Sequence, residues 1–293
     1  MSAFRSFLFT PGNHPRQVAK VFNAGADAAI LDLEDAVAIA EKPATRAAIV
    51  EALDRPRACL GYVRVNAYDT QFCFRDITAV VCPALDGIVL PKVESPDQVQ
   101  SIDWLLAHLE REQGLAPGSI DLMPIIETGK GVSNVAAIAS CGSRLRRLSF
   151  GAGDYTLDMN MIWSDDEREL EHARAAIALA SRAAGLEPPV DTVFIHIGEQ
   201  HRAALTASAR RAQGMGFQGK LCIHPEQIGP VNEVFTPGEA AVVHARKVIT
   251  AFDEAQAAGS ASIQVEGYFV DYPIVEKARR LIALMERIRA QQR

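Results

Sequence analysis

Residues 87–127, GIVLPKVESPDQVQSIDWLLAHLEREQGLAPGSIDLMPIIE, carry the pattern that decides the fold. Two short apolar runs, GIVLPKV and DLMPIIE, flank the amphipathic segment PDQVQSIDWLLAHLERE, which ends just before Gly114. Short apolar runs are typical of buried strands, and a glycine that follows a periodic segment is typical of a helix end. The stretch therefore predicts a strand, a helix and a second strand that pairs in parallel with the first.

The same alternation continues along the whole chain. The predicted strands are RSFLFT (5–10), AAILDLE (28–34), LGYVRVN (60–66), GIVLPKV (87–93), DLMPIIE (121–127), RRLSFGA (146–152), TVFIHI (192–197) and KLCIHP (220–225). Eight parallel units usually close into a (β/α)₈ barrel, an α/β fold of the TIM type, which we predict here. An open, doubly wound sheet is the alternative, but the turn TPGN (10–13) lacks the GxGxxG pattern usual after its first strand.

The pattern changes after residue 230. A long helical segment (237–259) is followed by SIQVEGYFVDYP (262–273), which has the pattern of a small hairpin, and by a last helical segment (273–290). We therefore predict a catalytic barrel over residues 1–230 and a C-terminal extension, acting as a lid, over residues 231–293.

Composition narrows the class of protein. A net charge of −6 over 293 residues argues weakly against nucleic acid as the partner. The five cysteines are scattered and form no CxxC pair, so free thiols fit better than disulfides or a zinc site. The sequence shows no run of about 20 apolar residues and no signal peptide, so we expect no membrane span and a cytoplasmic setting.

Two acidic residues stand directly after predicted strands. Glu127 ends DLMPIIE, and Asp154 ends LSFGAGD. In parallel α/β proteins the carboxyl ends of strands form the functional edge, and carboxylate oxygens are ligands that Mg²⁺ prefers. We favour a site in which Glu127 and Asp154 bind Mg²⁺, with water and substrate oxygens completing the shell. The alternative is a capping or ion-paired structural role.

Other charged residues follow the neighbouring strands. Arg64 lies inside an apolar run, where a guanidinium needs a partner, and it suits the capture of a carboxylate or an enolate-like oxygen. A structural ion pair with Asp32 or Glu34 is the alternative, and both roles are compatible. Asp32, Glu34 and Asp35 are supporting candidates. Lys92 could form a Schiff base, but we favour an ion-paired lysine.

Weaker signals come from two histidines and one loop. His196 and His224 each lie near a predicted strand end. His224 could be a general base, but we favour a hydrogen-bonded core histidine, and for His196 we favour a structural role. The loop TPGNHPRQ (10–17) precedes a helix start and includes Arg16, a combination that can bind phosphate, although a solvated loop is the simpler interpretation.

Several motifs occur in order along nearly the whole chain. They are RSFLFTPGNHPRQVAKVFNAGADAAILDLEDAV (5–37), YVRVNA (62–67), GIVLPKVES (87–95), PIIETGKGV (124–132), FGAGDYTLDM (150–159) and GFQGKLCIHPEQIGPVNEVFTPGE (216–239). Together they resemble the citrate lyase beta-subunit family, which belongs with the malyl-CoA and citramalyl-CoA lyases in the HpcH/HpaI aldolase superfamily.

The resemblance implies a Mg²⁺-dependent lyase that cleaves 3-hydroxyacyl thioesters by a Claisen-type reaction, in a homotrimer or hexamer. By resemblance, Glu127 and Asp154 match metal ligands, and Arg64 matches an arginine that stabilises the enolate. The segment EGYFVDYP (266–273) matches a lid motif whose aspartate, here Asp271, reaches the active site of a neighbouring subunit. The loop that holds Asn13 and Arg16 corresponds to part of the CoA-binding entrance.

The chain departs from the family pattern at two places. The metal loop often reads GxEDL, whereas here Gly153 precedes the aspartate, and VFIHIGEQ (193–200) replaces a DIRD-like run. Both bear on the identity of the substrate. The leading hypothesis is cleavage of citramalyl-CoA or malyl-CoA to acetyl-CoA and pyruvate or glyoxylate. The alternatives are a citrate lyase beta subunit acting on a citryl thioester of an acyl carrier protein, and a non-catalytic binder of acyl-CoA or 2-oxo acids.

Overall fold

Eight parallel strands close into a barrel in which each strand pairs with its neighbours in chain order. The computed structural model describes residues 4–291. The strands are β1 (Ser6–Pro11), β2 (Ala28–Asp32), β3 (Leu60–Arg64), β4 (Gly87–Leu90), β5 (Asp121–Ile126), β6 (Ser149–Phe150), β7 (Val190–Asp191) and β8 (Gly219–Cys222). β8 returns to pair with β1, Lys220 opposite Ser6, so the barrel prediction is confirmed and the open-sheet alternative is wrong.

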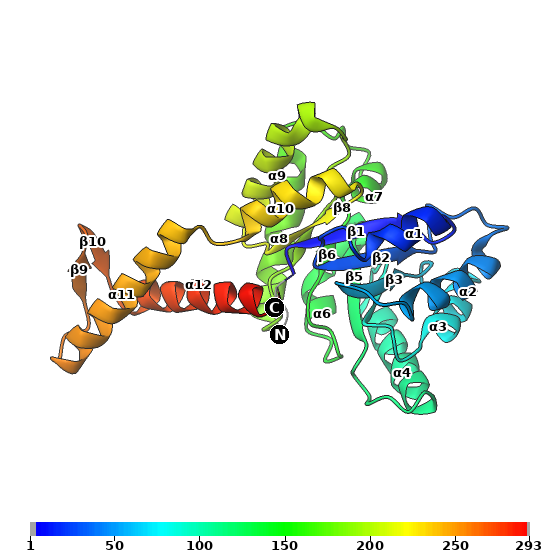
Figure 1. Ribbon diagram of the computed structural model, residues 1–293, viewed down its shortest axis with the longest axis horizontal. Coiled ribbons are helices and arrows are strands. Elements are labelled where there is room, and N and C mark those ends of the chain that lie inside the picture. Colours follow the sequence, from blue (N-terminus) through cyan, green and yellow to red (C-terminus); the bar gives the residue numbers. More distant parts are fainter. Residues whose placement is uncertain (1–3, 292–293) are drawn as a thin grey trace. The chain divides into compact units, whose positions relative to one another are not determined.

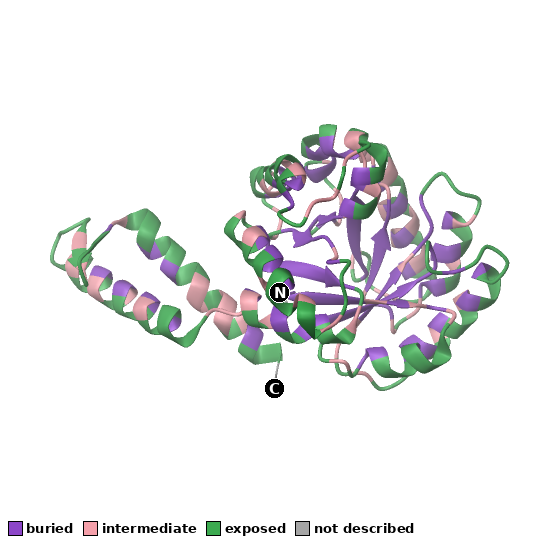
Figure 2. Cartoon of the chain, turned by 90° about the horizontal axis from the view of Figure 1, so that it is seen from above, coloured by how far each residue is buried: buried purple, intermediate pink, exposed green. Residues whose placement is uncertain are grey.

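Helices surround the barrel. They are α1 (Pro15–Val21), α2 (Lys42–Leu53), α3 (Cys73–Val80), α4 (Pro96–Glu112), α5 (Gly129–Ser133), α6 (Val135–Ala139), α7 (Ala152–Asp158), α8 (Glu171–Ala183), α9 (Arg202–Gly214) and α10 (Ile228–Phe235). Figure 2 shows the strands as a buried inner layer, while the outer faces of the helices are exposed. Each helix therefore buries one stripe against the strands.

Helix α4 shows how the local sequence produces this layer. Ser95 and Gln98 form a reciprocal capping box, and Pro96 occupies the first turn, where its missing N–H costs no hydrogen bond. Val99, Ile102 and Leu106 recur at helical spacing and are buried. The helix predicted over residues 96–112 is confirmed, and the apolar stripe and the cap that the structure shows are both local features of its sequence.

The prediction of the seventh strand is wrong. Strand β7 is Val190–Asp191, and residues 192–197 form an irregular segment instead of a strand. The side chain of Gln227 donates to the carbonyl oxygen of Phe194 at 2.8 Å and lies 3.3 Å from that of His196, so a side chain replaces a ladder partner. β-branched, apolar residues fit a strand or a packed loop equally, and the available partner decides between them.

Aromatic rings fill the amino-terminal end of the barrel interior. Phe7 lies 5.2 Å from the ring of Phe4 and 5.6 Å from that of Tyr62. The hydroxyl of Tyr62 donates to Asp121 Oδ2 at 2.8 Å. A Cβ on Gly87 would lie 2.2 Å from the Tyr62 ring, so only glycine fits beside it. This packing closes one end and leaves the polar side chains at the carboxyl ends of the strands.

The chain from Val234 onward forms a second compact unit, and the first unit ends at Glu233, close to the predicted boundary at residue 230. It contains α11 (Glu239–Ala257), β9 (Ile263–Val265), β10 (Tyr268–Val270) and α12 (Tyr272–Gln291). Strands β9 and β10 pair antiparallel, as the predicted hairpin requires, around Glu266 and Gly267, which both have positive φ. The role of this C-terminal unit as a lid remains a prediction.

The core of this second unit is small and apolar. Phe252 and Val248 of α11 pack with Val270 and with Val275 of α12. In the described part of the chain, no helix has the length and apolar character needed to cross a membrane.

Candidate active site at the carboxyl ends of the strands

Glu127 and Asp154 come together at the carboxyl ends of adjacent strands, around Lys92. Glu127 follows β5 and is only 4% exposed, while Asp154 lies in the first turn of α7, just after β6. The backbone N–H of Lys92 donates to Glu127 Oε1 at 2.8 Å, and Lys92 Nζ lies 2.9 Å from Asp154 Oδ2. The closed barrel therefore places both predicted carboxylates beside one residue at the end of β4.

A glycine makes room for the buried carboxylate. A Cβ on Gly151 would lie 2.3 Å from Glu127 Oε2 and 2.8 Å from Glu127 Cβ. Gly153, two residues later, has open space around it. The glycine at 151 is thus required by the position of Glu127, whereas position 153 has room for a side chain.

The electrostatics of Glu127 favour a nearby cation. Burial, with the neighbouring carboxylates of Glu34 and Asp154, raises the pKa of Glu127 to about 8 against the opposing charges of Arg64 and Lys92. Asp154 Oδ2 and Glu34 Oε2 are buried oxygens that accept no hydrogen bond, although each faces a cation. Hard oxygen donors in this state fit a divalent metal ion.

The protein supplies only some of the ligands in the coordination shell of a metal ion. Among residues 4–291, no three His, Cys, Asp or Glu side chains are placed as a complete ligand set. Mg²⁺ usually keeps several waters and takes one or two carboxylates from the protein. Glu127 and Asp154 therefore fit Mg²⁺ with water and substrate oxygens as the remaining ligands.

Arg64 is held firmly beside this pair. Its Nε and Nη2 donate to the two oxygens of Asp32, each at 2.7 Å, and its Nη1 lies 3.0 Å from Glu34 Oε2. The guanidinium also lies over the ring of Phe9, 4.8 Å from its centroid. Burial alone would raise the pKa of Asp32, but the charge of Arg64, together with the hydrogen bonds from Arg64 and from two backbone N–H groups, outweighs burial and lowers the pKa. Asp32 therefore stays ionised and orients Arg64.

The remaining supporting candidates differ in exposure. Glu34 is buried and lies between Arg64 and Lys92, whose Nζ donates to Glu34 Oε1 at 2.5 Å. Asp35 is 61% exposed and lies 3.7 Å or more from either cation. Burial lowers the pKa of Lys92, but its contacts with Glu34 and Asp154 prevail and raise it. A protonated, ion-paired lysine does not act as a Schiff-base nucleophile.

Comparison with known proteins assigns the family. The family model described as HpcH/HpaI aldolase/citrate lyase matches residues 5–225. The chain belongs to this family. Among curated proteins, it is 38% identical to the citrate lyase subunit beta of Leuconostoc mesenteroides, over 96% of this chain and 92% of the relative. It is 36% identical to the L-malyl-CoA/beta-methylmalyl-CoA lyase of Cereibacter sphaeroides, over 98% of this chain and 96% of the relative.

A solved structure supports the same assignment. The fold is similar to that of CitE from Mycobacterium tuberculosis in complex with magnesium, acetoacetate and coenzyme A, with a TM-score of 0.77 and 30% identity. The match covers 97% of this chain and 98% of that chain. The named relatives in the family are carbon–carbon lyases, and this chain is an enzyme of that class.

In this member of the aldolase/citrate lyase family, sequence analysis missed one residue that shapes the site. Lys42, at the start of α2, is buried, and its Nζ donates to the carbonyl oxygens of Leu33 and Glu34 at 2.7 and 2.6 Å. It also donates to Asn66 Oδ1 at 2.7 Å. Lys42 thereby fixes the loop that carries Glu34. A lysine in the first turn of a helix is ordinary in sequence, so no local signal could have identified it.

The predicted CoA-binding residues lie at the end of β1. Asn13 donates through Nδ2 to Glu41 Oε2, and its Oδ1 is buried without a hydrogen bond. Arg16 is exposed in the first turn of α1. Neither side chain has a recorded hydrogen bond or ion pair with the carboxylates around Lys92 in the described structure. Their role in binding stays a prediction.

Asp271 and the two histidines occupy different settings. Asp271 precedes α12 in the C-terminal unit, with its Oδ1 3.4 Å from the N–H of Ile274, in the manner of a helix cap. His196 is exposed, its ring stacked 4.9 Å from that of His201, and His224 is partly exposed and accepts from the N–H of Glu226 at 3.3 Å. The interpretation of His224 as a core residue is therefore wrong.

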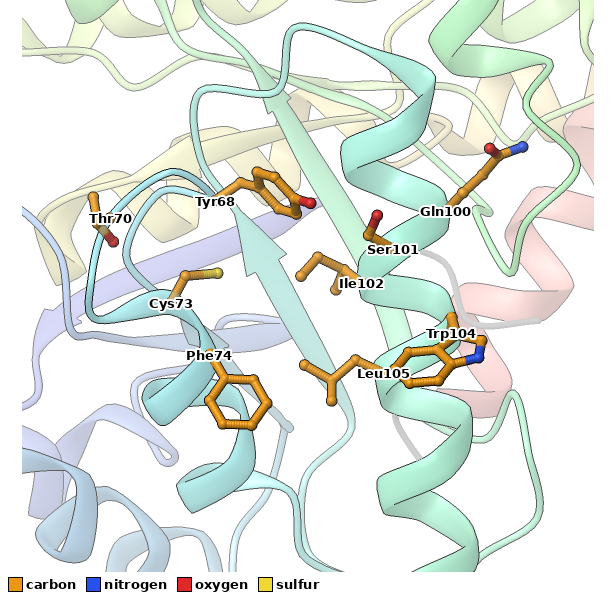
Figure 3. A pocket seen from close by; sticks show the side chains of 9 residues that line it. All are labelled: Tyr68, Thr70, Cys73, Phe74, Gln100, Ser101, Ile102, Trp104 and Leu105. Carbon is orange, nitrogen blue, oxygen red and sulfur yellow. The ribbon is translucent and has the colours of Figure 1, made fainter.

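A separate apolar groove lies between α3 and α4 (Figure 3). Its volume is about 650 Å³, and its lining includes Tyr68, Phe74 and Trp104. None of the predicted site residues lines this groove, and it contains no carboxylate. Its chemistry does not match that of the carboxylate site, so we do not take it as the active site.

Proposed function

We propose that this protein is a Mg²⁺-dependent lyase that cleaves a 3-hydroxyacyl-CoA thioester, of the malyl-CoA or citramalyl-CoA type, to acetyl-CoA and a 2-oxo acid. The observation that carries the proposal is the meeting of Glu127 and Asp154 beside Lys92 and the oriented Arg64. The similarity to a malyl-CoA/beta-methylmalyl-CoA lyase and to a CitE complex with magnesium, acetoacetate and coenzyme A supports it.

Glu127 and Asp154 would hold the metal. When bound, Mg²⁺ would polarise the oxygens of the 2-oxo acid portion and favour loss of the hydroxyl proton. Glu127 is buried, and the absence of a Cβ at Gly151 leaves space for its carboxylate, so the carboxylate is in place before the metal binds. The protein thereby supplies a preorganised pair of oxygen ligands, so little reorganisation is needed.

Arg64 is placed to stabilise negative charge. In the cleavage, a base takes the hydroxyl proton, the carbon–carbon bond breaks, and its electron pair moves to the thioester as the enolate of acetyl-CoA. A fixed guanidinium stabilises the developing oxyanion, and such preorganised charge is usually a large part of catalysis. The bidentate contact with Asp32 holds that guanidinium at one orientation.

Asp271 and the β1 loop complete the proposal. Asp271 of a neighbouring subunit in a trimer or hexamer would protonate the enolate carbon, which yields acetyl-CoA. Arg16 is an exposed cation and Asn13 has an amide oxygen without a hydrogen bond, which suits contact with the phosphates and polar groups of coenzyme A.

The direct test is an assay of the purified full-length chain. We expect it to release acetyl-CoA and glyoxylate from malyl-CoA, or acetyl-CoA and pyruvate from citramalyl-CoA, with activity lost in EDTA and restored by MgCl₂. Absence of turnover with either thioester at saturating Mg²⁺ would contradict the proposal.

A second candidate is the beta subunit of a citrate lyase, acting on a citryl thioester of an acyl carrier protein. The 38% identity to such a subunit over 96% of the chain favours it. The two candidates share the cleavage chemistry and differ in the acyl group and in the thioester carrier. Turnover of a citryl–carrier-protein thioester, without turnover of free CoA thioesters, would select the second candidate.

A further inference from the structure

Lys92 contacts three carboxylates of the site. Its backbone N–H contacts Glu127, and its ammonium group contacts Glu34 and Asp154. Its backbone is in the left-handed region, with φ of 52°, which is uncommon for a residue other than glycine. This conformation lets its N–H donate to Glu127 Oε1 at 2.8 Å. The N–H of the next residue, Val93, donates to the backbone carbonyl oxygen of Ile125. Backbone strain of this kind persists when surrounding contacts hold it in place.

The side chain of Lys92 reaches the other two carboxylates. Its Nζ lies 2.5 Å from Glu34 Oε1 and 2.9 Å from Asp154 Oδ2. The side chain is 35% exposed, so the ammonium group is not enclosed on all sides. A long, flexible stem allows such a group to change partner while its backbone stays fixed.

The carboxylate of Asp154 thus has two competing partners, a metal ion and the ammonium group of Lys92. The same residue is a proposed metal ligand and the ion-pair partner of Lys92. An ammonium and a divalent cation within a few ångströms of one another repel, and each needs the lone pairs of the carboxylate. Glu34, by contrast, keeps contact with Arg64, whose Nη1 lies 3.0 Å from its Oε2.

We propose that Lys92 is an internal counter-cation, whose ammonium group neutralises the charge of Asp154 before the metal binds. When a divalent cation binds, the ammonium group leaves Asp154 and keeps its contact with Glu34. Lys92 is then a positioning residue that lowers the affinity of the site for Mg²⁺ and stabilises the metal-free protein. The inference rests on the proposed function only in taking Glu127 and Asp154 as metal ligands.

The test measures metal binding, with no substrate present. MgCl₂ is titrated calorimetrically into metal-stripped wild type, Lys92→Met, Lys92→Gln and Lys92→Arg. We expect both neutral variants to bind Mg²⁺ at least about tenfold more tightly than wild type, because a repelling charge is removed. Lys92→Arg keeps the charge, so its affinity should stay within about threefold of wild type.

Lys130→Met is the matched control. Lys130 follows Glu127 by three residues, is 67% exposed and pairs with Glu94 Oε2 at 3.0 Å, so its removal deletes one nearby positive charge outside the carboxylate cluster. We expect a change in Mg²⁺ affinity of less than about threefold, since exposed charges are screened. An effect equal to that of Lys92→Met would overturn the proposal, because any lysine near the site would then act alike.

Thermal unfolding gives an independent measurement. In EDTA, the neutral Lys92 variants should unfold at a lower temperature than wild type, and MgCl₂ should raise their transition by more than it raises that of wild type. Binding by wild type together with equal or weaker binding by Lys92→Met and Lys92→Gln would overturn this inference alone. Absence of Mg²⁺ binding by wild type would overturn the metal site and the inference together.

Discussion

Asp32 and Arg64 form a two-pronged ion pair, in which Nε and Nη2 of the arginine donate to the two carboxylate oxygens at 2.7 Å. The oxygens of Asp32 also accept from the N–H groups of Glu34 and Ala36, at 3.0 and 3.1 Å. These contacts lie at the adjacent ends of β2 and β3. Asp32 engages two of the three guanidinium nitrogens, while the third lies 3.0 Å from Glu34 Oε2, so Asp32 is the main residue that orients Arg64.

Removing that carboxylate charge should therefore impair catalysis more than binding. We expect Asp32→Asn to lower kcat about 10- to 100-fold, because a loosened guanidinium no longer meets the developing charge at a fixed position. Arg64→Lys should cost about 10²- to 10³-fold, since an ammonium cannot form the bidentate contact. Steady-state kinetics on the preferred thioester give both values. Asp35→Asn, at a 61% exposed carboxylate, is the control and should change kcat less than about threefold.

A pair of glycines tests the position of Glu127. A Cβ at Gly151 would lie 2.3 Å from Glu127 Oε2, whereas a Cβ at Gly153 meets nothing within 4 Å. Gly151→Ala should therefore displace the carboxylate, weaken Mg²⁺ binding at least about tenfold and lower kcat about 100-fold. Gly153→Ala should bind Mg²⁺ as wild type does. Equal effects of the two substitutions would show that Glu127 does not depend on this glycine.

The proposed contribution of Asp271 to the site of a neighbouring subunit can be tested by mixing variants. Asp271→Asn keeps a side-chain oxygen for the N–H of Ile274, so α12 keeps its cap while the acid is lost. We expect kcat to fall about 100-fold with little change in KM. Co-folding Asp271→Asn with Glu127→Gln should regain part of the activity, because some sites in mixed oligomers would pair an intact Glu127 with an intact Asp271. Mixed oligomers that stay inactive would place both residues in the same subunit's site.

Stability at low pH should depend on Asp191, a residue that has no role in the proposed reaction. Asp191 is fully buried between Lys220 Nζ, 2.6 Å from its Oδ2, and Arg174, whose Nε donates to its Oδ1 at 2.8 Å. Burial alone would raise the pKa of Asp191, but the two cations outweigh it and lower the pKa below the unfolded value of about 3.8. The stabilisation is therefore complete above pH 3.8 and is lost as the pH falls through the lowered value.

The corresponding variant is Asp191→Asn. It should reduce the free energy of unfolding at pH 7 by about 3 to 5 kcal/mol, because the buried Lys220 loses its ion pair with Asp191 and the buried Arg174 keeps only its pair with Glu167. It should also flatten the acid limb of the stability curve. Urea denaturation followed from pH 7 down to pH 3 measures both. Asp253→Asn, at a pair with Arg279 in which both side chains are about half exposed, should cost less than about 1 kcal/mol.

The order of strands and helices could be predicted because each element carries its own periodicity. Runs such as GIVLPKV and DLMPIIE are buried on both faces, and the helix between them has its own cap and stripe. Glu127 and Asp154 could be singled out since polar residues directly after such runs lie at one edge of a parallel sheet. The prediction of the segment TVFIHI as a strand is wrong, because the side chain of Gln227, more than 30 residues later, donates hydrogen bonds to two of its carbonyl oxygens.

The sequence by itself determined that eight strand–helix units and a helical C-terminal extension are present, and which polar residues follow each strand, because period, caps and turn residues are local properties. Only the tertiary structure decided that Lys92 turns its N–H to Glu127 and its ammonium to Asp154, and that Lys42 holds the loop of Glu34. The reason is that a contact between strand ends depends on barrel closure and register, which bring together residues separated by tens of positions and which no local pattern encodes.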